Sequence, residues 1–372
     1  MREQYDVVIV GAGPAGVGMG SLFSQLGFRH FIILEKNEVG STFLQWPKET
    51  RLLTPSFPGH GFGLLDLNAV VPSTSPGYAY NTEHLDGSEY ADYLKQVAGH
   101  FKLPIKTGVD VLSVETDENR FTVETSKGTI TSRFVIWAGG EFQYPDRTPF
   151  KGSEHCIHPS DVKSWSDLPG SEQVIIGGYE SGMDAAYHLI GSGKKVTVIS
   201  KGEPWNSEDQ DPSVSLSPYT SDRLDGIFDH SNLNLLGHAE ATEVKKEGDK
   251  YLIHLRSDKV IASENPPIMA TGYKSSLIRI VEHLYWNEDG TAELTEKDES
   301  TITEGLFLTG PQVKHGNVIF CFIYKFRQRF AVIAEEILGR LGLEADEEVF
   351  RAYRRASMFL DDLSCCDNSC QC

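Results

Sequence analysis

The sequence has no apolar run that approaches the roughly 20 residues a membrane-spanning helix requires. It is also poor in positive charge, with 34 lysine and arginine residues against 53 aspartate and glutamate residues and a net charge of −19. A surface with this charge repels nucleic acid and anionic lipid. These two deficits predict a protein that binds neither a membrane nor nucleic acid.

Cysteine is scarce in the body of the chain, because four of the six cysteines fall in the last eight residues, "CCDNSCQC". The first strand-like run, "YDVVIV", begins at Tyr5 and leaves no room for a cleaved signal peptide, so we expect a cytoplasmic protein. Structural disulfides are rare in a reducing cytosol. The tail cysteines are therefore candidate soft-metal ligands or redox groups, with incidental thiols of a free end as the alternative: Cys365, Cys366, Cys370 and Cys372.

What the sequence does contain is a dinucleotide-binding pattern near its start. The 372 residues are enough for two or three domains. Residues 6–35 read as an apolar strand, a glycine turn, a small-residue helix and a second apolar strand that ends at Glu35. Gly11 permits the tight turn, Gly13 lets the backbone approach a pyrophosphate, and Gly16 lets the helix pack against the strand. Glu35 follows at the distance expected for a carboxylate that binds the ribose.

The same arrangement occurs twice along the chain. Alternating runs near residues 104–138 predict a β meander that ends at an Ala-Gly-Gly turn. A second strand, glycine turn, helix and strand follow at 173–200, with a second meander that ends at Ala-Thr-Gly. The fold class we expect is α/β, with two Rossmann-like dinucleotide-binding domains that each carry a three-stranded meander. Such a chain holds two dinucleotides, and electron transfer between them is its natural use.

The second glycine turn departs from the first at its middle position. Gly177 and Gly182 fit the pattern, but Tyr179 stands where the middle glycine belongs. The following strand ends in Ser200-Lys201 and has no acid there. A hydroxyl and a cation suit the 2′-phosphate of NADPH better than the free ribose of NADH, so we expect NADPH. The alternative for Lys201 is a solvated lysine with no ligand.

These motifs resemble the flavoproteins with two dinucleotide-binding domains, over nearly the whole chain. Within that class the sequence is most similar to flavin-containing monooxygenases, because "GSTFLQWPKETRLLTPS" resembles their segment beneath the flavin ring and "EYADYLKQVAGHFKL" the helix that follows. It also resembles the small bacterial flavoproteins labelled accessory proteins of a cobalt–zinc–cadmium exporter, which end in a comparable cysteine cluster.

The resemblance implies FAD and NADPH as cofactors and divides the chain into domains. We expect an FAD-binding domain at 1–165 and 272–364, an NAD(P)H-binding domain at 166–271 and a cysteine-rich tail at 365–372. The candidate FAD-binding residues are Gly11, Gly13, Pro14, Ala15, Gly16, Glu35, Lys36, Thr42, Trp46, Val111, Ala138, Gly139 and Gly310. The candidate NADPH-binding residues are Gly177, Gly178, Tyr179, Glu180, Ser181, Gly182, Ser200, Lys201 and Gly272.

The chain differs from these families at several positions. The linker motif F-x-G-x-x-x-H has a cysteine, Cys156, in the histidine place. Pro311 follows Gly310 where the class often has an aspartate at the ribityl chain of the flavin. Ala15 stands where related low-molecular-weight thiol disulfide reductases carry a cysteine, and neither glycine turn has a C-x-x-C or C-x4-C motif nearby. The flavin-adjacent disulfide of thioredoxin and glutathione reductases is therefore missing.

Three further segments give structural expectations. The apolar stretch from residue 317 to 341 predicts one long helix with Asn317 as its N-cap, and in this class the helix points its N-terminus at the flavin. Residues 344–363 predict a closing helix with Asp346 at its start. The polar, proline-containing stretch at 203–224 predicts either a loop over an interdomain cleft or a disordered insert.

The function expected from these features is oxidation of NADPH by FAD, followed by one of two reactions. The reduced flavin either oxygenates a small soft nucleophile containing sulfur or nitrogen, or it reduces a thiol disulfide or a metal ion with the tail cysteines as a relay. A metal-handling accessory protein with little turnover is the alternative from a different class. In each case FAD carries the chemistry, and few catalytic side chains are needed.

Overall fold

Two units make up the computed structural model, which describes residues 3–56, 66–117, 120–209 and 211–364. Unit 1 comprises Met1–Leu44, Pro55–Glu141 and Ser275–Cys372, and unit 2 comprises Gln45–Thr54 and Phe142–Lys274. Residues 142–165 were expected in the first domain, but they pack within unit 2, where Ile157 pairs with Ile268 and Trp165 lies in the core. The short segment Gln45–Thr54 was expected in the first domain as well, and it also belongs to unit 2.

Unit 1 is built on a sheet with parallel and antiparallel parts. Strands β3, β2, β1 and β6 lie side by side in that order and are parallel, and β6 continues antiparallel into β5 and β4. The last residues of β6 pair in parallel with β14. Within the described residues the strands are β1 (Glu3–Val10), β2 (Phe31–Leu34), β3 (Ile105–Lys106), β4 (Val111–Asp117), β5 (Arg120–Thr125), β6 (Gly128–Trp137) and β14 (Leu306–Leu308).

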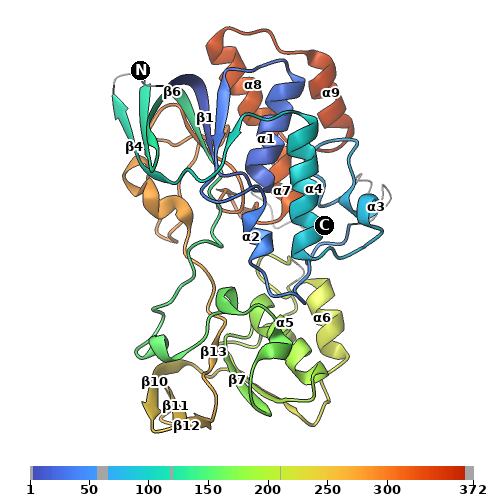
Figure 1. Ribbon diagram of the computed structural model, residues 1–372, viewed down its shortest axis with the longest axis vertical. Coiled ribbons are helices and arrows are strands. Elements are labelled where there is room, and N and C mark those ends of the chain that lie inside the picture. Colours follow the sequence, from blue (N-terminus) through green and yellow to red (C-terminus); the bar gives the residue numbers. More distant parts are fainter. Residues whose placement is uncertain (1–2, 57–65, 118–119, 210, 365–372) are drawn as a thin grey trace. The chain divides into compact units, whose positions relative to one another are not determined.

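Helices cover the parallel part of this sheet (Figure 1). Helix α1 packs against α4 and α8. The helices of unit 1 are α1 (Pro14–Gln25), α2 (Ser41–Leu44), α3 (Pro76–Tyr80), α4 (Gly87–His100), α7 (Ile323–Phe326), α8 (Phe330–Leu341) and α9 (Glu347–Arg355). The unit also has a short hairpin, β15 (Lys314–His315) and β16 (Val318–Ile319).

The N-terminal capping of α4 (Gly87–His100) explains why this helix can be predicted from the sequence. The Asp86 carboxylate accepts from the Glu89 backbone N–H, and the Glu89 side chain accepts from the Asp86 N–H. This reciprocal pair satisfies two donors that the start of a helix would otherwise leave free. Tyr90, Leu94 and Val97 then place one apolar stripe in the core. The expected helix is confirmed.

The long helix expected over residues 317–341 is wrong for its first six residues. Val318 and Ile319 form β16 of the hairpin, whose turn contains Gly316 at φ +53°. The helical residues begin at Ile323 and are interrupted by a 3₁₀ turn at Arg327–Arg329 before α8. β-Branched residues next to a left-handed glycine favour a hairpin, and this local preference prevails over the apolar spacing. The closing helix is confirmed as α9, with Asp346 as its N-cap.

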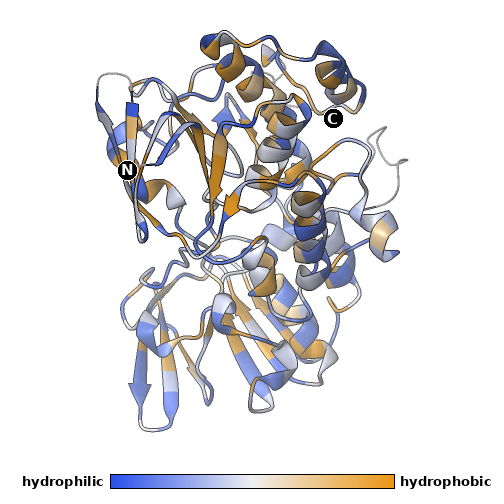
Figure 2. Ribbon diagram, turned by 45° about the horizontal axis from the view of Figure 1, so that its top comes forward, coloured by the Kyte–Doolittle hydropathy of each residue, from blue (hydrophilic) through white to orange (hydrophobic). Residues whose placement is uncertain are grey.

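The hydrophobic core of unit 1 is formed by side chains of its strands and of the inner faces of its helices. Val7, Val8 and Ile9 of β1 are fully buried, as are Phe330 and Ile333 of α8. In Figure 2 the hydrophobic colour is most continuous on the central strands of unit 1, whereas the helices carry both colours. Strands buried on both faces explain the continuous apolar run "VVIV" of the sequence.

Unit 2 repeats the plan on a smaller scale. Its parallel sheet has the order β13-β7-β8-β9, and a separate antiparallel meander has the order β10-β11-β12. The strands are β7 (Glu172–Ile176), β8 (Lys195–Ile199), β9 (Leu233–Leu236), β10 (Ala241–Glu247), β11 (Lys250–Leu255), β12 (Val260–Ser263) and β13 (Ile268–Met269), and the α-helices are α5 (Glu180–Gly191) and α6 (Pro218–Asp225). The duplicated α/β plan with two meanders is therefore confirmed.

The chain between the strands of unit 2 includes 3₁₀ turns at Ser153–His155, Pro159–Asp161, Trp165–Asp167 and Pro204–Asn206. In unit 1, 3₁₀ turns at Ser276–Arg279 and Val281–His283 follow the crossing from unit 2. Among the described residues, no helix is long and apolar enough to cross a membrane.

Candidate functional site

The first glycine turn, residues 11–16, joins β1 to α1 and is closed by backbone contacts on two sides. Gly11 has φ +103°, and a Cβ there would lie 2.5 Å from the carbonyl oxygen of Ala138. A Cβ on Gly16 would lie 1.9 Å from the carbonyl oxygen of Gly11. Both contacts are shorter than any real Cβ contact, so these two positions require glycine for packing.

Gly13 differs from its two neighbours because a Cβ built there meets no atom within 4 Å. Packing of the protein therefore does not explain a glycine at this position. Gly13 is the N-cap of α1, makes no side-chain capping bond and is followed by Pro14. The open space borders the positive end of a helix, and an anion such as a pyrophosphate fits there.

Glu35 lies at the end of β2 with its carboxylate already oriented. The residue is 3% exposed, and its carboxylate accepts from the Ala12 and Asn37 N–H groups, each at 2.8 Å. The Ser41 hydroxyl lies 3.5 Å away. A carboxylate has about four lone-pair positions, so acceptor capacity remains for the hydroxyls of a ribose. Lys36 points elsewhere, since its ammonium group pairs with Asp110 at 3.2 Å.

The remaining FAD candidates of unit 1 lie on several elements. Ala138 and Gly139 follow β6, and a Cβ on Gly310 would lie 3.7 Å from the Ala15 Cβ. Val111 is the buried first residue of β4, and Thr42 lies half-buried in α2. The structure therefore brings Gly11 close to Ala138 and Gly310 close to Ala15.

Trp46 belongs to unit 2 as part of segment Gln45–Thr54, whereas the FAD candidates described above belong to unit 1. The Lys48 N–H donates to the Lys163 carbonyl at 2.8 Å, and the Glu49 carboxylate accepts from the Trp165 N–H at 3.0 Å. The Trp46 ring lies 6.3 Å from the Phe142 ring. Sequence reasoning missed these contacts because they join residues 96 to 116 positions apart.

Gln312 was also missed by the sequence analysis. Its side-chain Nε2 is buried and has no hydrogen-bond partner among the described residues. It lies two residues after Gly310, beyond the proline that replaces the expected aspartate. A buried donor without a partner costs free energy, and a ligand with acceptor oxygens would satisfy it. The open space at Gly13, the Glu35 carboxylate and this donor fit a dinucleotide such as FAD.

The second glycine turn, residues 177–182, has the same construction as the first. Gly177 has φ +112°, and a Cβ there would lie 2.1 Å from the Ala270 carbonyl oxygen. A Cβ on Gly182 would lie 2.0 Å from the Gly177 carbonyl oxygen. A Cβ on Gly178 would lie 2.7 Å from the Ser200 Cβ and 2.8 Å from the Trp205 ring. Ser181 lies half-buried in the first turn of α5.

Tyr179 and Glu180 both contact the chain that follows Ser207. The Tyr179 hydroxyl donates to the Ser215 carbonyl at 2.5 Å, and the Glu180 carboxylate accepts from the Ser217 N–H and the Thr220 hydroxyl, each at 2.5 Å. Burial raises the pKa of Glu180, and these donors partly offset that effect. The described part of 203–224 is therefore packed onto the second glycine turn and includes α6.

Lys201 lies at the end of β8 in a group of charged side chains. It is strongly exposed and lies 3.3 Å from Glu240, whose other oxygen accepts from the Arg256 Nε at 2.5 Å. The hydrogen bond from Arg256 and that from Lys201 lower the pKa of Glu240 to about 2. Ser200 is buried beside this group. Arg256 follows β11, and no motif in the sequence pointed to it.

His158, two residues after the motif cysteine, contacts the turn that contains Gly272. Its Nε2 lies 3.1 Å from the carbonyl oxygen of Gly272, which has φ +85°, and its Nδ1 lies 2.9 Å from the Ser160 hydroxyl. The aligned motif position holds Cys156, a free thiol whose pKa is raised to about 12 by burial and by Glu154.

The tail cysteines Cys365, Cys366, Cys370 and Cys372 lie outside the described residues, so their redox and metal roles stay predictions. Within the described part of the chain the cysteines are Cys156 and Cys321. No group of three or more potential metal-ligating side chains occurs in that part.

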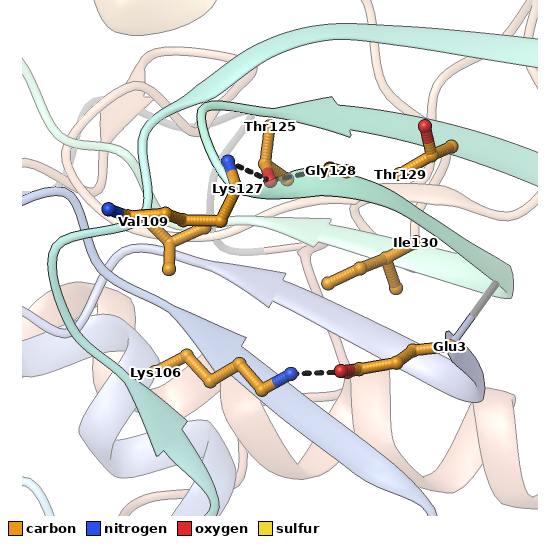
Figure 3. A pocket seen from close by; sticks show the side chains of 8 residues that line it. All are labelled: Glu3, Lys106, Val109, Thr125, Lys127, Gly128, Thr129 and Ile130. Atoms are coloured by element: carbon orange, nitrogen blue, oxygen red, sulfur yellow. Dashed lines mark hydrogen bonds and ion pairs between the residues drawn. The ribbon is translucent and has the colours of Figure 1, made fainter. Parts of the chain in front are cut away.

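Unit 1 also has a surface hollow of about 390 Å³ near the meander (Figure 3). An ion pair between Glu3 and Lys106 lies in it, and the Lys127 N–H donates to the Thr125 hydroxyl at 3.1 Å. It is lined by Glu3, Lys106, Val109, Thr125, Lys127, Gly128, Thr129 and Ile130, none of which is a candidate cofactor residue.

Comparison with known proteins decides the family. Residues 8–310 match the family described as pyridine nucleotide-disulphide oxidoreductase. The chain belongs to this family. This oxidoreductase is 24% identical over 345 residues to the bacilliredoxin reductase Bdr of Bacillus subtilis, with 91% of this chain and 98% of the relative covered. The family and its relatives make the chain an FAD-dependent oxidoreductase, as the sequence predicted.

Two further comparisons bear on the predicted resemblances. An uncharacterized CzcO-like oxidoreductase of Geobacillus kaustophilus is 28% identical over 193 residues, which cover 51% of this oxidoreductase and 52% of the relative. The structure of a flavin-containing monooxygenase from Stenotrophomonas maltophilia matches with a TM-score of 0.66 and 16% identity, over 91% of this chain and 99% of that chain. The predicted kinship with two-domain flavoproteins is confirmed.

Proposed function

We propose that this oxidoreductase binds FAD at the first glycine turn of unit 1 and a reduced nicotinamide dinucleotide, with NADPH preferred, at the second glycine turn of unit 2. When bound, FAD accepts a hydride from the nicotinamide and passes the electrons to a second substrate. The single observation that carries the FAD site is Gly13. A glycine that packing does not require, at the positive end of α1, reserves space for a phosphate.

The protein side chains have few tasks in this function. Glu35 accepts from the adenosine ribose, and the Gln312 amide donates to an oxygen of the same ligand. The N-terminal amides of α1 stabilise the phosphates. In unit 2, Ser200 and Lys201 meet the 2′-phosphate of NADPH, and Arg256 lies close enough to Glu240 to share that task. The preference for NADPH follows from these cations.

The second substrate is O₂, which accepts the two electrons; one of its oxygen atoms is transferred to the sulfur or nitrogen of a small soft nucleophile, and the other leaves as water. Ala15 occupies the position at which a flavin-adjacent thiol would stand, so the first glycine turn offers no thiol as an electron acceptor. Cys156 lies in unit 2, and its raised pKa keeps it a thiol at neutral pH. The likeness to a flavin-containing monooxygenase supports this choice at the level of the fold.

Reduction of a disulfide is the second candidate. The observation that favours it is the similarity to bacilliredoxin reductase over 91% of this chain. The tail cysteines, which lie outside the described residues, would then carry electrons from the flavin to an external disulfide. A metal-handling role with little turnover is the third reading, and it predicts that added NADPH leaves the flavin oxidised while soft metal binds stoichiometrically.

One experiment separates these reactions. FAD-loaded protein is reduced anaerobically with one equivalent of NADPH, and loss of flavin absorbance is followed. The reduced protein is then mixed either with O₂ and a thioether, with the sulfoxide measured by mass spectrometry, or anaerobically with a low-molecular-weight disulfide, with released thiols titrated. Sulfoxide in proportion to NADPH supports oxygenation. Thiol release without sulfoxide contradicts it and supports the reductase.

A further inference from the structure

We propose that Tyr179 and Glu180 latch residues 211–220 across the second glycine turn, and that a nicotinamide dinucleotide must open this latch to bind. The proposal rests on the proposed function of unit 2 and adds a gating role for a residue at the position of the middle glycine. All of these residues belong to unit 2: Tyr179 and Glu180 stand at the start of α5, and residues 211–220 lead into α6.

Tyr179 makes the first contact of the latch. It is the N-cap of α5, and its hydroxyl donates to the Ser215 carbonyl at 2.5 Å and lies 3.3 Å from the Pro212 carbonyl. A glycine at this position would leave the space free, as Gly13 does in unit 1. The tyrosine instead extends from the phosphate-binding position of the turn to the segment that follows β8.

Glu180 makes the second contact and is the stronger anchor. Its carboxylate accepts from the Ser217 N–H and the Thr220 hydroxyl, each at 2.5 Å, and from the Ser217 hydroxyl at 3.3 Å. Ser217 and Thr220 are 2% and 1% exposed, so these bonds are shielded from water. Hydrogen bonds to a charged acceptor are roughly twice as strong as neutral ones.

The latch and a dinucleotide compete for the same end of α5. The N-cap makes no side-chain capping bond, so the first N–H groups of the helix are available to an anion. A pyrophosphate that binds there must approach the turn at position 179, where the tyrosine side chain now leads to Ser215. The Trp205 ring packs against Gly178 and closes the neighbouring side of the turn.

The expected change in dinucleotide affinity follows from the fraction of molecules in which the latch is open. When the binding-competent state is only a fraction of the molecules, the apparent affinity falls by that fraction, and weakening the closed state restores it. A single hydrogen bond contributes about 1 kcal/mol. Removal of the Tyr179 bond should therefore tighten dinucleotide binding by roughly three- to tenfold.

The test measures the Kd of NADP⁺ for the oxidised, FAD-loaded protein by calorimetry, which requires no turnover. We expect Tyr179→Phe and Thr220→Val each to lower the Kd by roughly three- to tenfold. Tyr251→Phe changes a tyrosine on β11 of the same unit and should leave the Kd unchanged. An unchanged or higher Kd in both latch variants, with wild-type stability, would overturn the proposal.

Hydrogen exchange supplies a second readout. In the wild-type protein, NADP⁺ should accelerate amide exchange over residues 211–220, because the latch opens when the ligand binds. Slower exchange over these residues would mean that the segment closes over the ligand, and this contradicts the latch. Failure of both NADP⁺ and NAD⁺ to bind any of the proteins would instead overturn the proposed function of unit 2.

Discussion

At the scale of single residues, the three glycines of the first turn have two different purposes. Gly11 and Gly16 are fixed by contacts of less than 3 Å between a hypothetical Cβ and a backbone oxygen. Gly13 makes no such contact. The same sequence motif therefore combines residues that fold the turn with a residue that serves the ligand, and substitutions can separate the two.

The first prediction uses this separation. Gly13→Val should leave the thermal stability of the apoprotein near the wild-type value, but it should weaken FAD binding by roughly 10- to 100-fold, the equivalent of one or two hydrogen bonds to a charged group. Fluorescence titration of apoprotein with FAD measures this. Gly99→Ala, in α4, also meets no atom within 4 Å and is the matched control. Retention of full FAD affinity by Gly13→Val would place the cofactor elsewhere.

The second prediction concerns the charged group at the end of β8. Lys201→Ala should raise the KM for NADPH by roughly fivefold and change the KM for NADH little, because only NADPH carries the 2′-phosphate. Glu240→Gln should lower the KM for NADPH, because Glu240 pairs with both Lys201 and Arg256 and its removal leaves these two cations to the 2′-phosphate. Lys245→Ala, which removes a meander lysine paired with Glu243, is the control. Equal effects on both nucleotides would remove the argument for NADPH.

At the scale of elements, Asp184 of α5 joins four parts of unit 2. Its Oδ1 accepts from the Arg223 Nη1 of α6 at 2.8 Å and lies 3.4 Å from the His188 Nε2. Its Oδ2 accepts from the Thr50 hydroxyl at 2.8 Å and from the Trp165 indole N–H at 3.2 Å. Burial opposes ionisation of this carboxyl, but His188 and Arg223 outweigh it and lower the pKa to about 2.

The third prediction follows from that pKa. Because the pKa of Asp184 is lower in the folded state than the ordinary 3.8, its contribution to stability is present above pH 3.8 and is lost as the pH falls toward 2. The full contribution is about 2 kcal/mol at roughly 1.4 kcal/mol per pKa unit. Urea unfolding between pH 6 and pH 2 measures it.

Asp184→Asn provides the comparison for that experiment. The variant should be about 3 kcal/mol less stable at neutral pH, since it leaves the half-buried Arg223 without its carboxylate. Its stability should also depend less on pH between 5 and 3 than that of the wild type. A parallel decline in both proteins would show that other groups cause the acid sensitivity.

Sequence reasoning predicted elements that are specified locally. The strand–turn–helix units and α4 are recognisable because their caps, glycines and apolar spacing lie within a few residues of one another. Sequence reasoning failed where contacts between residues far apart in the sequence determine the position of a segment. Nothing near Gln45 or Ser217 in the sequence indicates that Asp184 and Glu180 hold these segments. At Asn317 the prediction failed for a different reason: the local signal for a helix start competes with the local preference for the hairpin, and the hairpin forms.

At the scale of the whole molecule, each unit has its own hydrophobic core. The core of unit 1 extends from β1 to α9, and unit 2 has separate clusters on the two faces of its parallel sheet. Residues 365–372 lie outside the described residues, so the expectation that the tail acts in reactivity and not in folding stays a prediction.

The fourth prediction tests that expectation. A chain that ends at Ser364 should keep its melting temperature, its FAD content and its rate of flavin reduction by NADPH. If the tail is a relay, disulfide reduction should fall sharply and an oxidised cysteine pair of the full chain should become reduced on addition of NADPH. If it is a metal trap, metal binding should be lost instead. A large loss of stability on truncation would contradict the expectation.

The chain passes between the two units four times, and the smaller excursion, Gln45–Thr54, leads to a fragment-complementation experiment. A polypeptide of residues 142–274 contains both sheets of unit 2 but lacks Glu49 and Thr50, the partners of Trp165 and Asp184. We expect this fragment to be unstable alone and to be stabilised by a synthetic peptide of residues 45–54 added in trans, as measured by a rise in its melting temperature. A peptide with Thr50→Val and Glu49→Gln should stabilise it less. Residues 45–54 and residues 142–274 would then behave as the two fragments of a split protein.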